Sequence, residues 1–184
     1  MSTEYADGRI GFGAPPSAAE LLRAFRADRE HHTHPVLDTA AALVRCHERR
    51  RHAQRDARAP GVPSSRVAAC SQVVDDVDVV RMRLIARIDT WVAENIPHRD
   101  GASLHTETLG SVIDRMAAKW VAAQHALGLP APDARPGSRS RTGTAHRGVN
   151  GEAHLQWVRL AELADGYKDL ITDVTEHRRR LPVF

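Results

Sequence analysis

Apolar residues recur every three or four positions along most of the chain, the spacing that places them on one face of an α-helix. The clearest run lies in residues 64–95, where the apolar positions step by four, three, four, four and three: Val73, Val77, Val80, Leu84, Ile88 and Trp91. Such steps are typical of the seam between packed helices. The pattern predicts a long helix from Ser64 or Ser65 to about Asn95.

The same spacing predicts four further helices. A short one begins after Ser17, which forms a capping box with Glu20, and ends near Arg29. Longer ones cover residues 35–58, 106–127 and 152–179, and Thr33 or His34 caps the first of them. Their predicted inward residues include Val36, Leu37, Ala40, Ala41, Leu43, Val44 and Ala53, then Leu109, Val112, Ile113, Met116, Trp120 and Ala123, and finally Trp157, Leu160, Ala164, Tyr167, Ile171 and Val174.

These elements predict an all-α protein, an antiparallel four-helix bundle with the short helix packed across one end. A chain of 184 residues suits a single domain, which we place at residues 17–182. Residues 1–16 carry Gly and Pro without periodicity, which predicts a flexible leader. Residues 129–151 are rich in Pro, Gly and Arg and predict a mobile loop, whose arginines either keep it soluble or hold phosphate or sulfate esters.

Composition excludes several classes of protein. Hydrophobic residues make up 42% of the chain, too many for intrinsic disorder, and the formal charge of +3 is far below that of a dedicated nucleic-acid binder. No apolar run approaches the roughly 20 residues that span a bilayer. The first residues lack the basic and apolar segments of a secretion signal. We therefore expect a cytoplasmic protein that binds neither nucleic acid nor a membrane.

The chain carries no familiar cofactor or metal motif. The sequences GxGxxG and GxxxxGK[ST] do not occur between a strand and a helix, and Cys46 and Cys70 have no partners at zinc-site spacing. His31, His32 and His34 fall between helices without such partners. We expect no metal and no cofactor, and we expect the two cysteines to fill the core.

The polar stretch from His105 to Arg115 is the most informative part of the chain. Gly110 lies inside a predicted helix, where it costs about 1 kcal/mol relative to Ala, so a neighbouring helix or a ligand should approach its backbone closely. Glu107 and Asp114 are seven positions apart, which places them on one helical face. The predicted catalytic residues are Asp114, His105 and Glu107, and the predicted substrate-binding residues are Arg115, Arg83, Asp89, Thr106 (also the expected N-cap) and Tyr167.

Acidic residues recur beside the apolar seams of three helices and leave two alternatives open. They converge at the interior as a carboxylate metal site, or they pair with arginines on solvated faces. The acids are Asp75, Asp78, Asp89, Glu107, Asp114, Glu162, Asp165 and Asp169, and the arginines are Arg81, Arg83, Arg87 and Arg115.

Four segments, LHTETLGSVIDRMAAKWVAA, LIARIDTWV, THPVL and RLAELADGYKDLITDVTEHRRRLP, together resemble the actinobacterial branch of the DUF4254 family, a domain of unknown function. The resemblance covers about residues 20–128 and 152–182, and its most specific part is residues 105–115 with Ile88 and Asp89. The chain differs from the family at residues 75–78, where the family is more basic. The resemblance implies the fold and the location of the site, but no reaction.

We expect an enzyme of specialised metabolism that acts on a small anionic metabolite by acid–base chemistry or intramolecular displacement. One alternative is a non-catalytic helical module that binds a partner protein or forms a homodimer. Another is a metal-dependent hydrolase of nucleotides, which needs three carboxylates near one point. An open pocket lined by the predicted residues favours the enzyme, and a closed network of hydrogen bonds favours the module.

Overall fold

The computed structural model describes residues 13–27, 32–97, 99–128 and 146–182. Within them the fold is all-α apart from two strands of two residues each, which confirms the predicted class. The helices are α1 (Ala18–Arg26), α2 (Pro35–Ala57), α3 (Ser64–Asn95), α4 (Leu109–Ala126) and α5 (His146–Thr175). Residues 1–12 of the predicted leader and residues 129–145 of the predicted loop lie outside the described residues.

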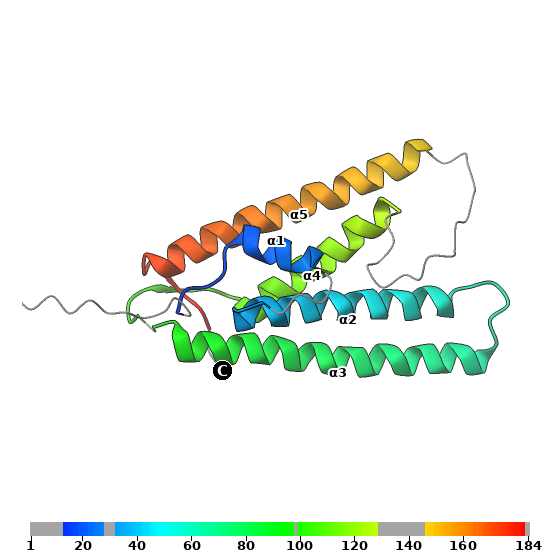
Figure 1. The fold of residues 1–184 in the computed structure, drawn as a ribbon, viewed down its shortest axis with the longest axis horizontal. Helices are drawn as coiled ribbons and strands as arrows, with labels where there is room; N and C mark the ends of the chain where they lie inside the picture. The colour runs from blue at the N-terminus through cyan, green and yellow to red at the C-terminus, as the bar shows by residue number, and fades with distance from the viewer. Residues whose placement is uncertain (1–12, 28–31, 98, 129–145, 183–184) are drawn as a thin grey trace, which may run out of the picture.

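The four long helices alternate in direction (Figure 1). α2 and α3 form an extended hairpin, α4 packs on both of them, and α5 packs on α4. The short helix does not lie across one end, as predicted, but between α2 and α5. The reason is its apolar face, because Leu21 and Phe25 are buried there with the core residues of the longer helices.

Local side chains decide where the helices begin. Ser17 Oγ accepts from the Glu20 amide at 3.3 Å and the Glu20 carboxylate accepts from the Ser17 amide at 2.8 Å, which confirms the capping box. At the start of α2, His34 rather than Thr33 is the cap, and its Nδ1 lies 3.2 Å from the Val36 amide. The structure places the start of α4 at Leu109, three residues later than predicted, with Thr108 as the N-cap.

The last helix differs from the prediction at both ends. It begins at His146, so that residues 146–151 are helical, and it ends at Thr175 instead of Arg179. His177 has φ 60° and ends the helix with two Schellman hydrogen bonds, Arg178 N to Asp173 O at 2.8 Å and His177 N to Val174 O at 3.1 Å. The strand β2 (Arg179–Arg180) then pairs in parallel with β1 (Ser103–Leu104), which ties the end of α5 to the segment before α4.

The core follows the predicted seams closely. All six residues predicted to face inward on α4 are buried. Aromatic contacts join α1, α4 and α5: the tilted rings of Phe25 and Trp120 have centroids 6.1 Å apart, and the edge-to-face rings of Trp120 and Trp157 have centroids 5.7 Å apart. Val77 and Ile88 of α3 are buried as predicted, but Val80 is exposed, and the next residue, Arg81, faces α4 and pairs with Asp114. No helix in the described part of the chain is long and apolar enough to cross a membrane.

Candidate functional site

Five charged or titratable side chains meet where α2, α3 and α4 come together. Asp114 Oδ1 of α4 lies 2.8 Å from Nε2 of His47 on α2 and 3.2 Å from Nε of Arg81 on α3. Arg81 also pairs with Asp78, and Asp78 Oδ1 lies 3.2 Å from Nε of Arg50 on α2. We call these five residues the three-helix cluster.

The three-helix cluster is buried at the α4 end and open at the other. The side chains of His47 and Asp114 are only 11% and 15% exposed, whereas those of Asp78 and Arg50 are 34% and 37% exposed. Burying ionisable groups costs free energy that a packed apolar contact would not cost. Groups of this kind cluster at functional sites, so the cluster is a candidate site with a physical reason behind it.

Two donors in the three-helix cluster are left over. The buried Nε atoms of Arg50 and Arg81 form no hydrogen bond among the described residues, although each lies 3.2 Å from a carboxylate oxygen. The distance permits an ion pair, but the direction of the N–H bond does not suit a hydrogen bond. These two buried donors are therefore paired in charge but not in hydrogen bonding.

A cavity of about 290 Å³ lies beside the open end of the cluster, between α2 and α3. Gln54 comes one helical turn after Arg50 on α2, and Val74 comes one turn before Asp78 on α3, so the two features adjoin along the same groove. A volume of this order suits a small metabolite. We call it the hairpin groove; its lining residues are Ala53, Gln54, Ala57, Arg58, Cys70, Ser71, Val74 and Asp75.

Asp89, predicted to bind substrate, instead holds the start of α4. Its Oδ1 accepts a hydrogen bond from the Gly110 amide at 2.8 Å. A Cβ atom on Gly110 would lie 2.6 Å from the carbonyl oxygen of Ile85 and 2.8 Å from Asp89 Oδ1. The sequence predicted that either a neighbouring helix or a ligand approaches Gly110 closely. In the structure the neighbouring helix α3 makes this approach.

The pKa of Asp89 is raised by burial, which outweighs the hydrogen bonds from Gly110 and Thr108 that lower it. The folded protein thus binds this proton more tightly than the unfolded chain, and the residue's contribution to stability falls as the pH rises through the window above its ordinary pKa of 3.8. Asp89→Asn keeps an acceptor for Gly110 but cannot ionise. As the pH rises from 4 to 7, we expect the free energy of unfolding of the variant to increase relative to that of the natural protein. Urea unfolding measures both values. A relative loss over that interval would contradict this account.

Glu107 and Arg115 pair with each other at the surface. Nη1 and Nη2 of Arg115 donate to Oε1 and Oε2 of Glu107 at 3.2 and 2.7 Å. His105 Nδ1 lies 2.8 Å from the Glu107 carbonyl oxygen and 3.2 Å from its amide nitrogen, within the same turn. The expectation that Glu107 shares a helical face with Asp114 is wrong, because α4 begins only at Leu109.

The other predicted residues lie apart from the three-helix cluster. Thr106 is exposed before α4, and Arg83 is exposed on α3. Tyr167 is buried in α5, where its hydroxyl donates to the Pro16 carbonyl at 2.7 Å, and burial raises its pKa. Of the eight predicted site residues only Asp114 belongs to the three-helix cluster, and none of the eight is among the residues that line the hairpin groove.

The predicted convergence of acids from three helices does not occur. Glu162, Asp165 and Asp169 are exposed on α5. Asp78 and Asp114 both pair with Arg81, as the other alternative expected, but Asp114 and Arg81 lie between helices and not on a solvated face. In residues 13–27, 32–97, 99–128 and 146–182, no three His, Cys, Asp or Glu side chains are grouped so that they could hold a metal ion.

The two cysteines are free thiols on neighbouring helices. Cys70 is buried in the hairpin groove, in keeping with its predicted place in the core, and Cys46 is half-buried. Burial raises the pKa of the Cys46 thiol, which disfavours the reactive thiolate.

His47, Arg50, Asp78 and Arg81 were not predicted as site residues. The available signal was the helical register of α2, where the buried positions Val36, Ala40 and Leu43 are followed at the same spacing by His47 and Arg50. A polar residue that continues an apolar seam must face another helix, and it therefore needs a partner there.

Comparisons with known proteins give a family and no function. The model of a family described as proteins of unknown function (DUF4254) matches residues 37–183. The matched segment contains the three-helix cluster and the hairpin groove but not α1. No curated protein and no solved structure matches the chain.

Proposed function

Since the chain belongs to the DUF4254 family of proteins of unknown function, we propose a function from its own side chains. The protein is an enzyme that binds a small anionic metabolite next to the three-helix cluster and moves a proton with His47 and Asp114. The observation that carries the proposal is the convergence of a His–Asp pair and two arginines from three helices beside a cavity. Such a set joins an acid–base group to an anion-binding group.

The contact between His47 and Asp114 supports the acid–base role. A carboxylate 2.8 Å from Nε2 fixes the orientation of the imidazole ring, as a positioned acid–base group requires. When Nε2 donates to Asp114, Nδ1 is the nitrogen that accepts and returns a proton. Asp114, predicted as catalytic, is then a positioning residue for His47.

Arg50 and Arg81 support the binding of an anion. A guanidinium group presents several N–H donors in one plane, which match the oxygens of phosphate, sulfate or carboxylate. The Nε–H groups of both arginines lack hydrogen bonds among the described residues, so an anion would satisfy them. The rest of the ligand would then extend into the hairpin groove toward Gln54 and Asp75.

A thermal-shift screen against phosphorylated, sulfated and carboxylated metabolites tests the binding step. We expect a subset of these compounds to raise the melting temperature, and Arg50→Gln to abolish the increase. Arg66→Gln is the matched control, because it removes the same charge from an exposed site at the start of α3. An equal loss in both variants would show that only overall charge matters, and a screen without a hit would end the proposal.

Asp114→Asn tests the catalytic step once a ligand is known. We expect turnover to fall by about 10²–10⁴-fold, the usual contribution of a positioned acid–base group, with the melting temperature within a few degrees of the natural protein. His47→Gln should give a loss of similar size. A large drop in melting temperature with unchanged turnover would instead make Asp114 a structural ion-pair residue.

A non-catalytic interaction module is the second candidate, and one observation favours it. Asp89, His105, Glu107 and Arg115 are bonded to one another or to the backbone, and none of them lines the hairpin groove. Polar side chains that are bonded within the protein in this way favour a module over an enzyme. Light scattering of the purified chain would show a stable homodimer if this candidate is right and the enzyme is wrong.

A further inference from the structure

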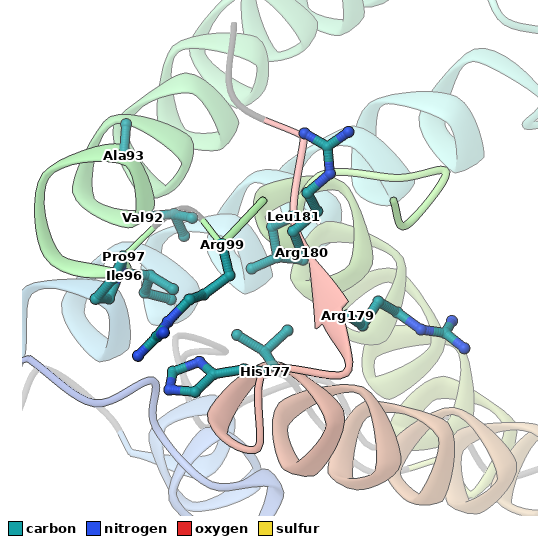
Figure 2. Close-up of a pocket in the computed structure, with 10 residues that line it drawn as sticks. Val92, Ala93, Ile96, Pro97, Arg99, His177, Arg179, Arg180 and Leu181 are labelled. Carbon is teal, nitrogen blue, oxygen red and sulfur yellow. The ribbon is translucent and has the colours of Figure 1, made fainter. Parts of the chain in front are cut away.

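A second cavity lies at the other end of the molecule from the hairpin groove, where α3 and α5 both end (Figure 1, Figure 2). Its volume is about 80 Å³. Apolar side chains form one wall, and the polar part comes from the segment after α3 and the turn after α5. The lining residues are Val92, Ala93, Ile96, Pro97, Arg99, Val174, His177, Arg179, Arg180 and Leu181.

The polar side chains of this pocket are all basic. None of the ten described residues that line it is acidic. In Figure 2 the Arg99 guanidinium and the His177 ring lie next to each other, while the side chains of Arg179 and Arg180 extend away from them. Two acids near the end of α5 are already paired, Asp173 with Arg178 and Arg179, and Glu176 with Arg178. Neither the Arg99 side chain nor the His177 side chain has a hydrogen bond or ion pair within the described residues.

The backbone of His177 adds an independent observation. This residue occupies the left-handed position of the Schellman turn, with φ 60°, where glycine is favoured because other residues carry a Cβ atom that crowds the backbone. A residue that keeps an unfavourable backbone conformation while its side chain reaches a cavity is a candidate for a function at that cavity. The turn places His177 at the pocket that Arg99 also lines.

We propose that this pocket binds a tetrahedral oxyanion, phosphate or sulfate, either free or as the terminal group of a small molecule. A cavity of about 80 Å³ is well below the roughly 300–1,000 Å³ typical of pockets that enclose a whole ligand, so only a small group fits in it. Arg99 supplies a planar set of donors and His177 supplies a ring N–H, both suited to oxyanions. The anion joins the end of α3 to the end of α5. This site is separate from the three-helix cluster.

Titration with inorganic phosphate and with sulfate, followed by melting temperature at constant ionic strength, tests the proposal. We expect a saturable increase with either anion and none with chloride, because a ligand that binds only the folded state stabilises it. Arg99→Gln should weaken binding at least tenfold, and Arg66→Gln should leave it unchanged. The absence of a saturable increase would overturn the proposal.

His177→Gly separates binding from stability. Without anion the variant should melt at a higher temperature than the natural protein, because glycine adopts φ 60° without strain. Phosphate should no longer raise the melting temperature of this variant. A full phosphate effect in both His177→Gly and Arg99→Gln would overturn the proposal. If Arg50→Gln alone removed the effect, the anion would bind at the three-helix cluster, and this inference would fail while the proposed function stood.

A phosphomonoester such as glycerol phosphate distinguishes the two sources of the anion. Tighter binding of the ester than of inorganic phosphate indicates a terminal group of a larger ligand, and the reverse indicates the free ion. Both outcomes must depend on Arg99 and His177, and binding of either compound that survives both substitutions contradicts the proposal.

Discussion

Gly110→Ala is expected to lower the free energy of unfolding by about 2 kcal/mol, although alanine is the better helix former. The new Cβ atom would lie 2.6 Å from the Ile85 carbonyl oxygen and 2.8 Å from Asp89 Oδ1. The first of these atoms belongs to the backbone of α3 and cannot move without moving the helix. Overpacking of this kind costs about 1–3 kcal/mol and exceeds the gain of about 1 kcal/mol in helix propensity. Urea unfolding followed by circular dichroism measures the change.

Gly166→Ala is the matched control for this prediction. Gly166 is an exposed residue inside α5, and a Cβ atom added to it would meet nothing within 4 Å. We expect this variant to be more stable by up to about 1 kcal/mol, because only the propensity term acts. If both substitutions changed stability in the same direction, the contact between α3 and α4 would not be the reason that position 110 requires glycine.

α4 shows how far the apolar pattern alone predicts this fold. Its inward residues Leu109, Val112, Ile113 and Met116 are all buried, because a period of three or four positions defines a face without reference to the rest of the chain. The starting residue was predicted less well. Several residues before α4 are able to cap a helix. Thr108 is the cap in a structure where the Gly110 amide also donates to Asp89, which is 21 positions away in the chain. Contacts between distant segments of this kind are not written in local sequence.

The end of α5 was predicted incorrectly for a similar reason. Residues 176–180 are compatible with a helix, yet the chain turns at His177 and Arg180 accepts a hydrogen bond from the His105 amide at 2.8 Å. The pairing of β2 with β1 decides this geometry, and two strands of two residues each leave no periodic signal.

The three-helix cluster shares one residue, Asp114, with the site predicted from the sequence. Arg83 was predicted as an anion-binding residue, whereas Arg81 is the arginine that pairs with Asp114. Two positions along a helix correspond to a rotation of about 200°, so these arginines lie on opposite faces. Which face meets α2 and α4 depends on the rotation of α3 in the packed protein. The sequence of α3 supplies arginines on both faces, so it does not decide between them.

Phe25→Ala is expected to have the largest effect on stability, about 3–5 kcal/mol. The match to the family begins at residue 37, yet the side chain of Phe25 in α1 is only 3% exposed, and its ring lies 6.1 Å from that of Trp120. The buried Tyr167 hydroxyl also donates to Pro16, just before α1. Truncation of Phe25 would leave a cavity between α2, α4 and α5 that the surrounding helices cannot fill without moving.

Leu127→Ala provides the comparison, because Leu127 is 47% exposed and its truncation opens no cavity. We expect it to change the free energy of unfolding by about 0.5 kcal/mol or less, as is usual at the surface. Urea unfolding of both variants at neutral pH gives the difference. Equal effects would mean that α1 is not part of the cooperative unit. The expected difference of several kcal/mol is a large share of the 5–15 kcal/mol that stabilises a typical domain, so the folding unit must extend beyond the matched segment to α1.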